Sequence, residues 1–196
     1  MAAPSISLTP RALNPWYDGP RRYGYVSRIL HWSMAFLMLW QFAGMVAKVT
    51  LGRSSPLTGL LAGAHSNVGL LLLVLAVVRA IWALSQRTHR PGHAAGVQAF
   101  AAWLVHTLMY LLMLIVPALA ALRMLGNNRA FSWFGVIPLN DGTGEKVEWM
   151  VAPACAFHGL LGWVLGALIL GHMVMVLVHH FMWKDDVAAR MAGRVR

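Results

Sequence analysis

Two histidines, His158 and His172, lie 14 positions apart (172 − 158) in residues 149–183, a stretch without Lys, Arg, Asp or Glu. In an α-helix, a separation of this length falls about 40° short of four full turns and climbs about 21 Å. The two imidazoles therefore share one helix face at two heights. Because histidine is costly inside an apolar span, the pair indicates two binding sites stacked along one helix.

The composition places this helix in a membrane. Of the 196 residues, 59% are hydrophobic and only 11% are charged, and the mean hydropathy is +0.61. A spanning helix needs about 20 apolar residues, and none of the long apolar stretches alternates like a barrel strand. Four charge-free stretches qualify, at residues 29–47, 54–78, 91–122 and 149–183. We predict an all-α fold, an integral membrane four-helix transmembrane bundle.

The net charge of +10 does not indicate nucleic-acid binding, because the basic residues are spread along the span ends. When the loops are assigned alternately, one side holds eleven basic residues: Arg11, Arg21, Arg22, Arg28, Arg79, Arg87, Arg90, Lys184, Arg190, Arg194 and Arg196. The other side holds five, namely Lys48, Arg53, Arg123, Arg129 and Lys146. The positive-inside rule then predicts a multi-pass membrane protein with both termini in the cytoplasm.

The chain divides into a short leading segment and one membrane domain. Residues 1–22 contain four prolines and no apolar run, so we predict a flexible cytoplasmic N-terminal segment rather than a signal peptide. Residues 23–192 then form the four-helix domain, and Ser27 is the expected N-cap of its first span. Cys155 is the only cysteine, which excludes an intrachain disulfide, and no C-x-x-C-H pattern for c-type heme attachment is present.

Span directions pair the histidines by depth. His31 lies early in the outward-running first span, and His172 lies late in the inward-running fourth span, so both should lie toward the cytoplasm. His65 and His158 each lie early in an inward-running span, so both should lie toward the outside. The sequence therefore predicts two His/His pairs, one above the other.

Two neutral imidazoles saturate a heme iron, which suits electron transfer rather than oxygen binding. Two hemes about 21 Å apart would carry an electron across most of an apolar core of about 30 Å. The alternative is a heme-free transporter or structural membrane protein, in which the histidines pack between helices or relay protons. His106 could donate a hydrogen bond near the inner heme or near a bound quinone. The alternative is that His106 only packs between helices. His179 lies 21 positions from His158 (179 − 158), near the opposite edge of the core, and so is not preferred over His172.

The pattern resembles the bacterial cytochrome b561 family over about residues 23–192. The elements that carry the resemblance follow in order along the four spans: Ser27, Arg28, His31 and Trp32; His65, Gly69 and Arg79; His106, Tyr110 and Pro117; His158, Gly159 and His172; and finally His179, His180, Phe181, Trp183, Lys184 and Asp185. Together, in register with four spans, these elements are fairly specific.

The resemblance implies two b-type hemes, with iron ligated by the pairs His31/His172 and His65/His158. It also implies that the protein is a diheme cytochrome similar to the superoxide oxidases. These enzymes are superoxide:ubiquinone oxidoreductases, which pass electrons from periplasmic superoxide to ubiquinone. Other members of the family are heme-bearing subunits that link a partner hydrogenase or dehydrogenase to the quinone pool. Arg28 and Arg79 would either neutralise the propionates of the inner heme or anchor their helices at the headgroups.

Overall fold

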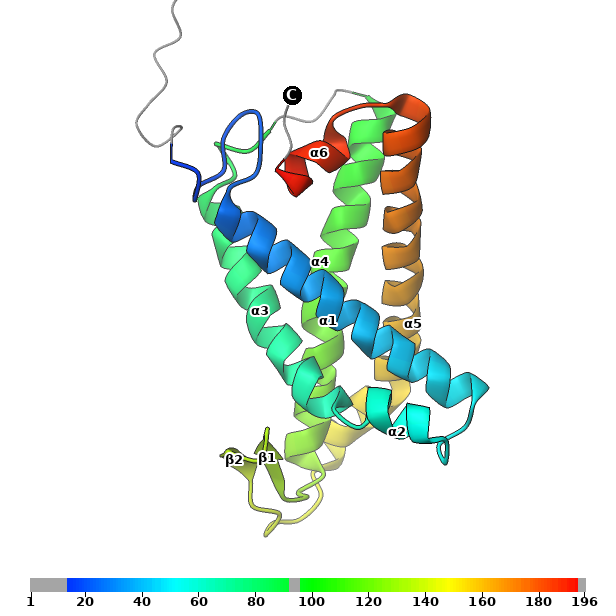
Figure 1. Ribbon diagram of the computed structural model, residues 1–196. Coiled ribbons are helices and arrows are strands. Elements are labelled where there is room, and N and C mark those ends of the chain that lie inside the picture. Colours follow the sequence, from blue (N-terminus) through cyan, green and yellow to red (C-terminus); the bar gives the residue numbers. More distant parts are fainter. Residues whose placement is uncertain (1–13, 92–95, 194–196) are drawn as a thin grey trace, which may run out of the picture.

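Four long helices form the molecule, and the computed structural model describes them within residues 14–91 and 96–193. They are α1 (Tyr25–Thr50), α3 (His65–Ser85), α4 (Val97–Gly126) and α5 (Glu148–Val178), with the short helix α2 (Pro56–Ala62) leading into α3. Each of the four candidate spans is apolar and long enough to cross a membrane, with lengths of 26, 30, 30 and 36 residues. The predicted all-α membrane bundle is confirmed (Figure 1).

The long helices pack in sequence around the bundle: α3 packs against α1, α4 against α3, and α5 along α4. Their shared core consists of Met34, Met38, Val68, Leu72, Ala76 and Leu165. Residues of α1 and α3 recur in this core at intervals of four, which keeps them on one helix face. Most other large apolar side chains point outward, as expected of helices that face lipid rather than water.

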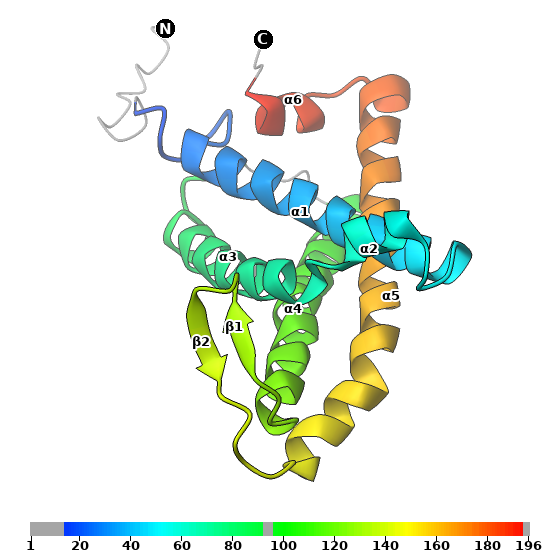
Figure 2. The ribbon, with the colours of Figure 1, turned by 60° about the horizontal axis from the view of Figure 1, so that its bottom comes forward.

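A β-hairpin closes one end of the bundle, which we call the hairpin end. Strands β1 (Phe131–Trp133) and β2 (Ile137–Asn140) pair antiparallel in the connection between α4 and α5. The hairpin lies beside the start of α3 (Figure 2), where the Trp133 indole donates to the Asn67 carbonyl (3.1 Å). The Phe134 amide donates to the Asn67 side chain (2.9 Å). These bonds fix the hairpin two residues from His65.

The described N-terminal residues lie at the other end, which we call the terminal end. Asp18 is buried there and accepts hydrogen bonds from the Gly24 amide (2.9 Å), the Ser27 hydroxyl (2.9 Å) and the Arg90 guanidinium (3.1 Å). The segment predicted to be flexible over residues 1–22 lies outside the described residues up to residue 13. From residue 14 it packs more closely than we expected.

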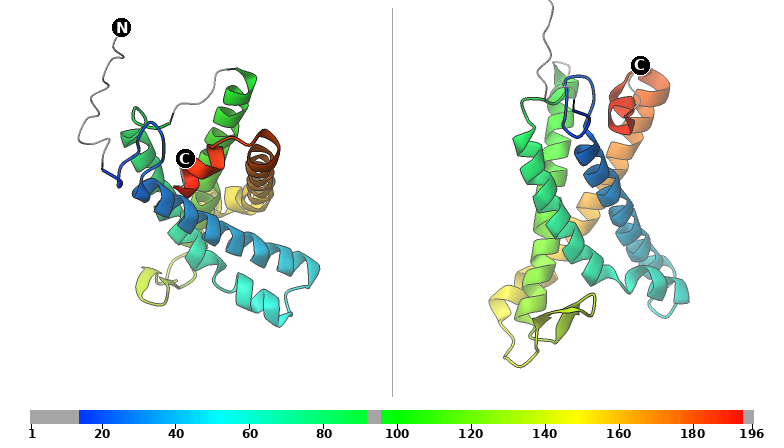
Figure 3. Two further views of the ribbon diagram at one scale, coloured as in Figure 1. Left: turned by 45° about the horizontal axis from the view of Figure 1, so that its top comes forward. Right: turned by 60° about the vertical axis from the view of Figure 1, so that its left-hand side comes forward.

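The C-terminal residues return to the same end. After α5, a π-helical turn, η2 (His179–Trp183), leads through Lys184 in the left-handed region (φ 52°) to α6 (Val187–Ala192). α6 lies across the terminal end between α1 and α5 (Figure 3). There the Arg28 guanidinium donates to the Ala192 carbonyl (2.8 Å), so α1 holds the last turn of α6.

Candidate functional site

The structure brings His65 and His158 together at the hairpin end. His65 is the first residue of α3, and His158 lies in the third turn of α5. Their ring centroids are 6.1 Å apart, and the ring planes are nearly perpendicular at 86°. Both side chains are half-buried between their helices. The two rings thus face each other across a space that could hold one metal-centred group.

A main-chain carbonyl fixes the orientation of His158. Its Nδ1 lies 2.9 Å from the carbonyl oxygen of Val116, in the peptide bond that precedes Pro117 of α4. A carbonyl only accepts, so Nδ1 carries the proton and the lone pair of the neutral ring is on Nε2. Ligand histidines commonly have this arrangement, because the second hydrogen bond sets the tautomer and the ring angle.

Gln41 of α1 contacts one member of the pair, His65. Its Nε2 donates to the main-chain carbonyl of His65 (2.9 Å), and its side chain is buried. Two buried atoms beside this bond have no hydrogen-bond partner among the described residues: Gln41 Oε1 and His65 Nδ1. The sequence analysis did not identify Gln41, although it is one of few polar residues in the first apolar stretch.

A second cluster lies toward the terminal end. Arg79 of α3 joins two of its members, because its guanidinium lies 3.1 Å from His31 Nδ1 and donates to the Tyr110 hydroxyl (2.9 Å). The nearest described ring to His172 is that of His106, with centroids 5.2 Å apart. His31 interacts electrostatically with Arg79, His172 and His106. Helices α1, α3, α4 and α5 therefore each contribute a polar side chain to one inner cluster.

The two clusters lie at different heights on a single helix. His158 and His172 both belong to α5, which runs without a break from Glu148 to Val178. Fourteen residues of unbroken helix separate them by about 21 Å. This geometry places two histidine clusters one above the other along the span.

The other histidines of the sequence pattern lie elsewhere or have other partners. His179 Nδ1 lies 2.5 Å from the Asp185 carboxylate, and the His179 ring contacts Trp183. Burial raises the pKa of Asp185, but hydrogen bonds from His179 and the Val187 amide outweigh it and leave that pKa below its usual value. This pair closes the turn after α5. Among the described residues, no group of three or more His, Cys, Asp or Glu side chains gathers around a metal position.

The glycines of α5 differ in their surroundings. A Cβ at Gly166 would lie 2.8 Å from the Phe42 ring, so this glycine allows α1 and α5 to approach closely. At Gly159 and Gly162 a Cβ would meet nothing within 4 Å. Gly159 is exposed, so the space beside it opens onto the surroundings of the bundle.

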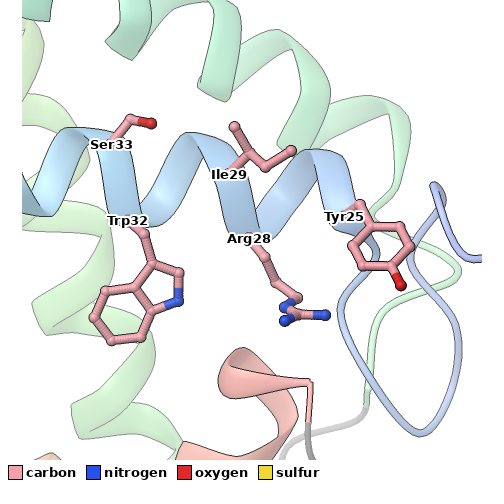
Figure 4. A pocket seen from close by; sticks show the side chains of 5 residues that line it. All are labelled: Tyr25, Arg28, Ile29, Trp32 and Ser33. Carbon is pink, nitrogen blue, oxygen red and sulfur yellow. The ribbon is translucent and has the colours of Figure 1, made fainter.

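A shallow pocket at the terminal end borders the inner cluster, because the ring of its lining residue Trp32 lies 5.2 Å from the ring of His31. It is lined by residues of α1, namely Tyr25, Arg28, Ile29, Trp32 and Ser33. Arg28 and Trp32 point toward α6 (Figure 4), and the Trp32 indole lies 3.4 Å from the Met191 carbonyl. The polar groups of this pocket therefore hold α6 in place.

Comparisons with known proteins identify the family of this chain. The family model described as prokaryotic cytochrome b561 matches residues 22–194. Cytochrome b561 homolog 2 of Escherichia coli is 28% identical over 179 residues, covering 89% of this chain and 93% of that protein. Cytochrome b561 homolog 1 of the same organism is 25% identical over 178 residues, covering 88% of this chain and 98% of that protein.

Proposed function

The chain belongs to the prokaryotic cytochrome b561 family of heme-bearing membrane electron-transfer proteins, and we propose that it carries electrons from superoxide to ubiquinone across a bacterial inner membrane. The observation that carries this proposal is the stacking of two histidine clusters about 21 Å apart on α5. Residues 23–192 form the cytochrome b domain, embedded in the lipid bilayer. The hairpin end faces the periplasm, and both termini lie in the cytoplasm.

His65 and His158 hold the outer of two b-type hemes. A metal lies about 2 Å from an imidazole nitrogen, so two imidazoles on opposite sides of one metal have ring centroids about 6 Å apart. The observed separation of 6.1 Å fits this value. One-electron chemistry comes from the heme when it is bound. The role of the chain would be to hold the two imidazoles that bind the heme iron, and the Val116 carbonyl orients the ring of His158.

In this proposal His31 and His172 hold the inner heme, and the Arg79 guanidinium pairs with the propionates of that heme. While Arg79 donates to His31 Nδ1, the proton of a neutral His31 ring must sit on Nε2. Ligation through Nε2 needs that proton on Nδ1 instead, so Arg79 must turn away from His31. Tyr110 keeps the guanidinium inside the bundle, where a carboxylate is its preferred partner.

His106 is the rival of His31, because its ring is the one nearest to His172. We expect His31→Ala to lose the inner heme and His106→Gln to keep both hemes, because the sequence pattern assigns the partner of His172 to the first span. The His106 Nδ1 bond to the Ala102 carbonyl (2.6 Å) has the same form as the His158 bond to Val116, which is why His106 has to be tested. The measurement is heme content per chain after purification of each variant. Loss of a heme in His106→Gln with none lost in His31→Ala would reassign the inner ligand to His106.

Cations at the hairpin end favour an anionic electron donor. Lys48 at the end of α1 and Arg123 at the end of α4 both interact electrostatically with His65. Their positive potential attracts superoxide toward the outer pair. Two superoxide anions are oxidised to two molecules of dioxygen, and ubiquinone takes up the two electrons with two protons to give ubiquinol.

The proposal is tested with the purified protein in detergent, supplied with enzymatically generated superoxide and a short-chain ubiquinone. We expect quinone reduction above the uncatalysed rate, and we expect Lys48→Gln with Arg123→Gln to lower it, most strongly at low salt. Arg21→Gln with Arg22→Gln at the opposite end is the charge-matched control. A heme-loaded protein that reduces no quinone with superoxide would overturn superoxide as the donor.

A further inference from the structure

Gln41 is a polar residue buried in an apolar span, where such side chains are costly and rarely without function. Only 8% of its surface is exposed. One half of its amide is engaged, because Nε2 donates to the His65 carbonyl (2.9 Å). The other half, Oε1, is a buried acceptor without a donor among the described residues. The bond to His65 therefore accounts for the amide nitrogen of Gln41 but leaves its amide oxygen unexplained.

His65 has the complementary need. Its Nδ1 is also buried and has no partner in the described part of the chain. If Nε2 ligates iron, Nδ1 must carry the proton and becomes a donor without an acceptor. The opposite ligand does not share this problem, because His158 Nδ1 donates to the Val116 carbonyl (2.9 Å).

We propose that Gln41 is the positioning residue of the outer heme, with Oε1 accepting the Nδ1 proton of His65. This inference rests on the proposed role of His65 as an iron ligand. One side chain then holds its neighbour twice, at the main-chain carbonyl and at the ring. The Gln41 amide also lies against the next turn of α3, because a Cβ at Gly69 would make ordinary contact with Gln41 Nε2 at 3.4 Å.

The bond has an electronic consequence. An acceptor on Nδ1 raises the basicity of the ligating nitrogen, which stabilises ferric over ferrous iron and lowers the reduction potential. Gln41 therefore sets the potential of the outer heme, whereas the equivalent bond at His158 comes from the main chain and is not open to side-chain variation.

The test compares three variants by redox titration of the heme-loaded protein. Gln41→Met keeps the length of the side chain but removes both donor and acceptor, and Gln41→Glu removes the donor but keeps an acceptor. We expect Gln41→Met to raise the potential of one heme and leave the other unchanged, and Gln41→Glu to place that potential at or below the wild-type value. Gln86→Leu removes another buried glutamine, at the end of α3 far from His65, and should shift neither potential.

A second readout is retention of heme. Loss of a hydrogen bond to a metal-ligating histidine typically weakens metal binding about 10-fold to 100-fold. The Gln41→Met variant should therefore release one heme to an acceptor protein faster by about that factor. Gln41→Leu serves in the same comparison if Gln41→Met does not fold. His158→Ala identifies the affected heme, because it should remove the one whose potential shifts.

The outcomes separate this inference from the proposed function. A wild-type protein without two hemes would overturn the proposed function itself. Two hemes with potentials unchanged in Gln41→Met would overturn only the role of Gln41. An equal rise in Gln41→Met and Gln41→Glu would also overturn it, because the donor to the His65 carbonyl would then be the part that matters.

Discussion

His158→Ala should reduce the heme content from two per chain to one. The substitution removes one axial nitrogen and leaves His65 without the ring that faces it 6.1 Å away. The inner cluster lies about 21 Å further along α5, too far for the change to disturb it. The retained heme should keep its spectrum, while electron transfer across the membrane is lost. The measurement is pyridine hemochrome quantitation against protein concentration.

His179→Ala is the matched control for this prediction. It removes a histidine from the end of the same helix, where the partner is the Asp185 carboxylate rather than a second imidazole. We expect it to retain both hemes. Equal heme loss in the two variants would mean that α5 is generally sensitive to substitution, and the assignment of His158 as a ligand would fail.

Asp18→Ala should destabilise the terminal end more than any other substitution outside the histidine clusters. The carboxylate is buried and serves three donors, so its removal leaves the Gly24 amide, the Ser27 hydroxyl and the Arg90 guanidinium without their acceptor. Removing one member of a buried charge pair costs about 3 kcal/mol at the low end of the usual range. The low end applies here because the Arg90 side chain is partly exposed (25%) and can be hydrated once the Asp18 carboxylate is gone.

The check is the thermal unfolding midpoint in detergent, followed by tryptophan fluorescence. Asp18→Asn is the informative partner variant, because it keeps an acceptor for the Gly24 amide and should lose less stability than Asp18→Ala. Tyr17 stacks on Trp82 in the same region, so the emission of Trp82 should change when the terminal end unfolds. An unchanged midpoint in Asp18→Ala would show that residues 14–24 do not stabilise the bundle.

The fold followed from the sequence because hydrophobicity and span length decide it. Charges marked the ends of the spans well, with two instructive exceptions. Arg79 directly follows the charge-free stretch 54–78. The helix α3 nevertheless continues to Ser85, because the Arg79 guanidinium is partnered by His31 and Tyr110 inside the bundle. The same stretch breaks at Gly63 and Ala64 into α2 and α3, which hydropathy does not reveal.

Depth could be predicted, but rotation about the helix axis could not. The order of the spans placed His65 with His158 and His31 with His172. Which ring faces His172 depends on how α4 packs on α5, and this packing brings His106 closest. Ser27 was expected to cap α1, but its hydroxyl donates to Asp18, and the helix begins two residues earlier at Tyr25. Such tertiary partners lie outside any local pattern.

Gln41 shows the same limit at the candidate site. The sequence analysis did not identify it, because only the packing of α1 against α3 places its amide at the His65 carbonyl. The hairpin is similar, because its bonds to Asn67 depend on where α3 begins.

The central claim is that this bundle holds two b-type hemes between paired histidines at two depths. A reduced-minus-oxidised optical spectrum of the purified wild-type protein, with pyridine hemochrome quantitation and protein mass measured on the same sample, tests it most directly. The account predicts two b-type hemes per chain after heme-replete expression. One heme per chain would contradict the stacked pairs, and a colourless protein would contradict the electron-transfer account and favour a proton relay through the same histidines.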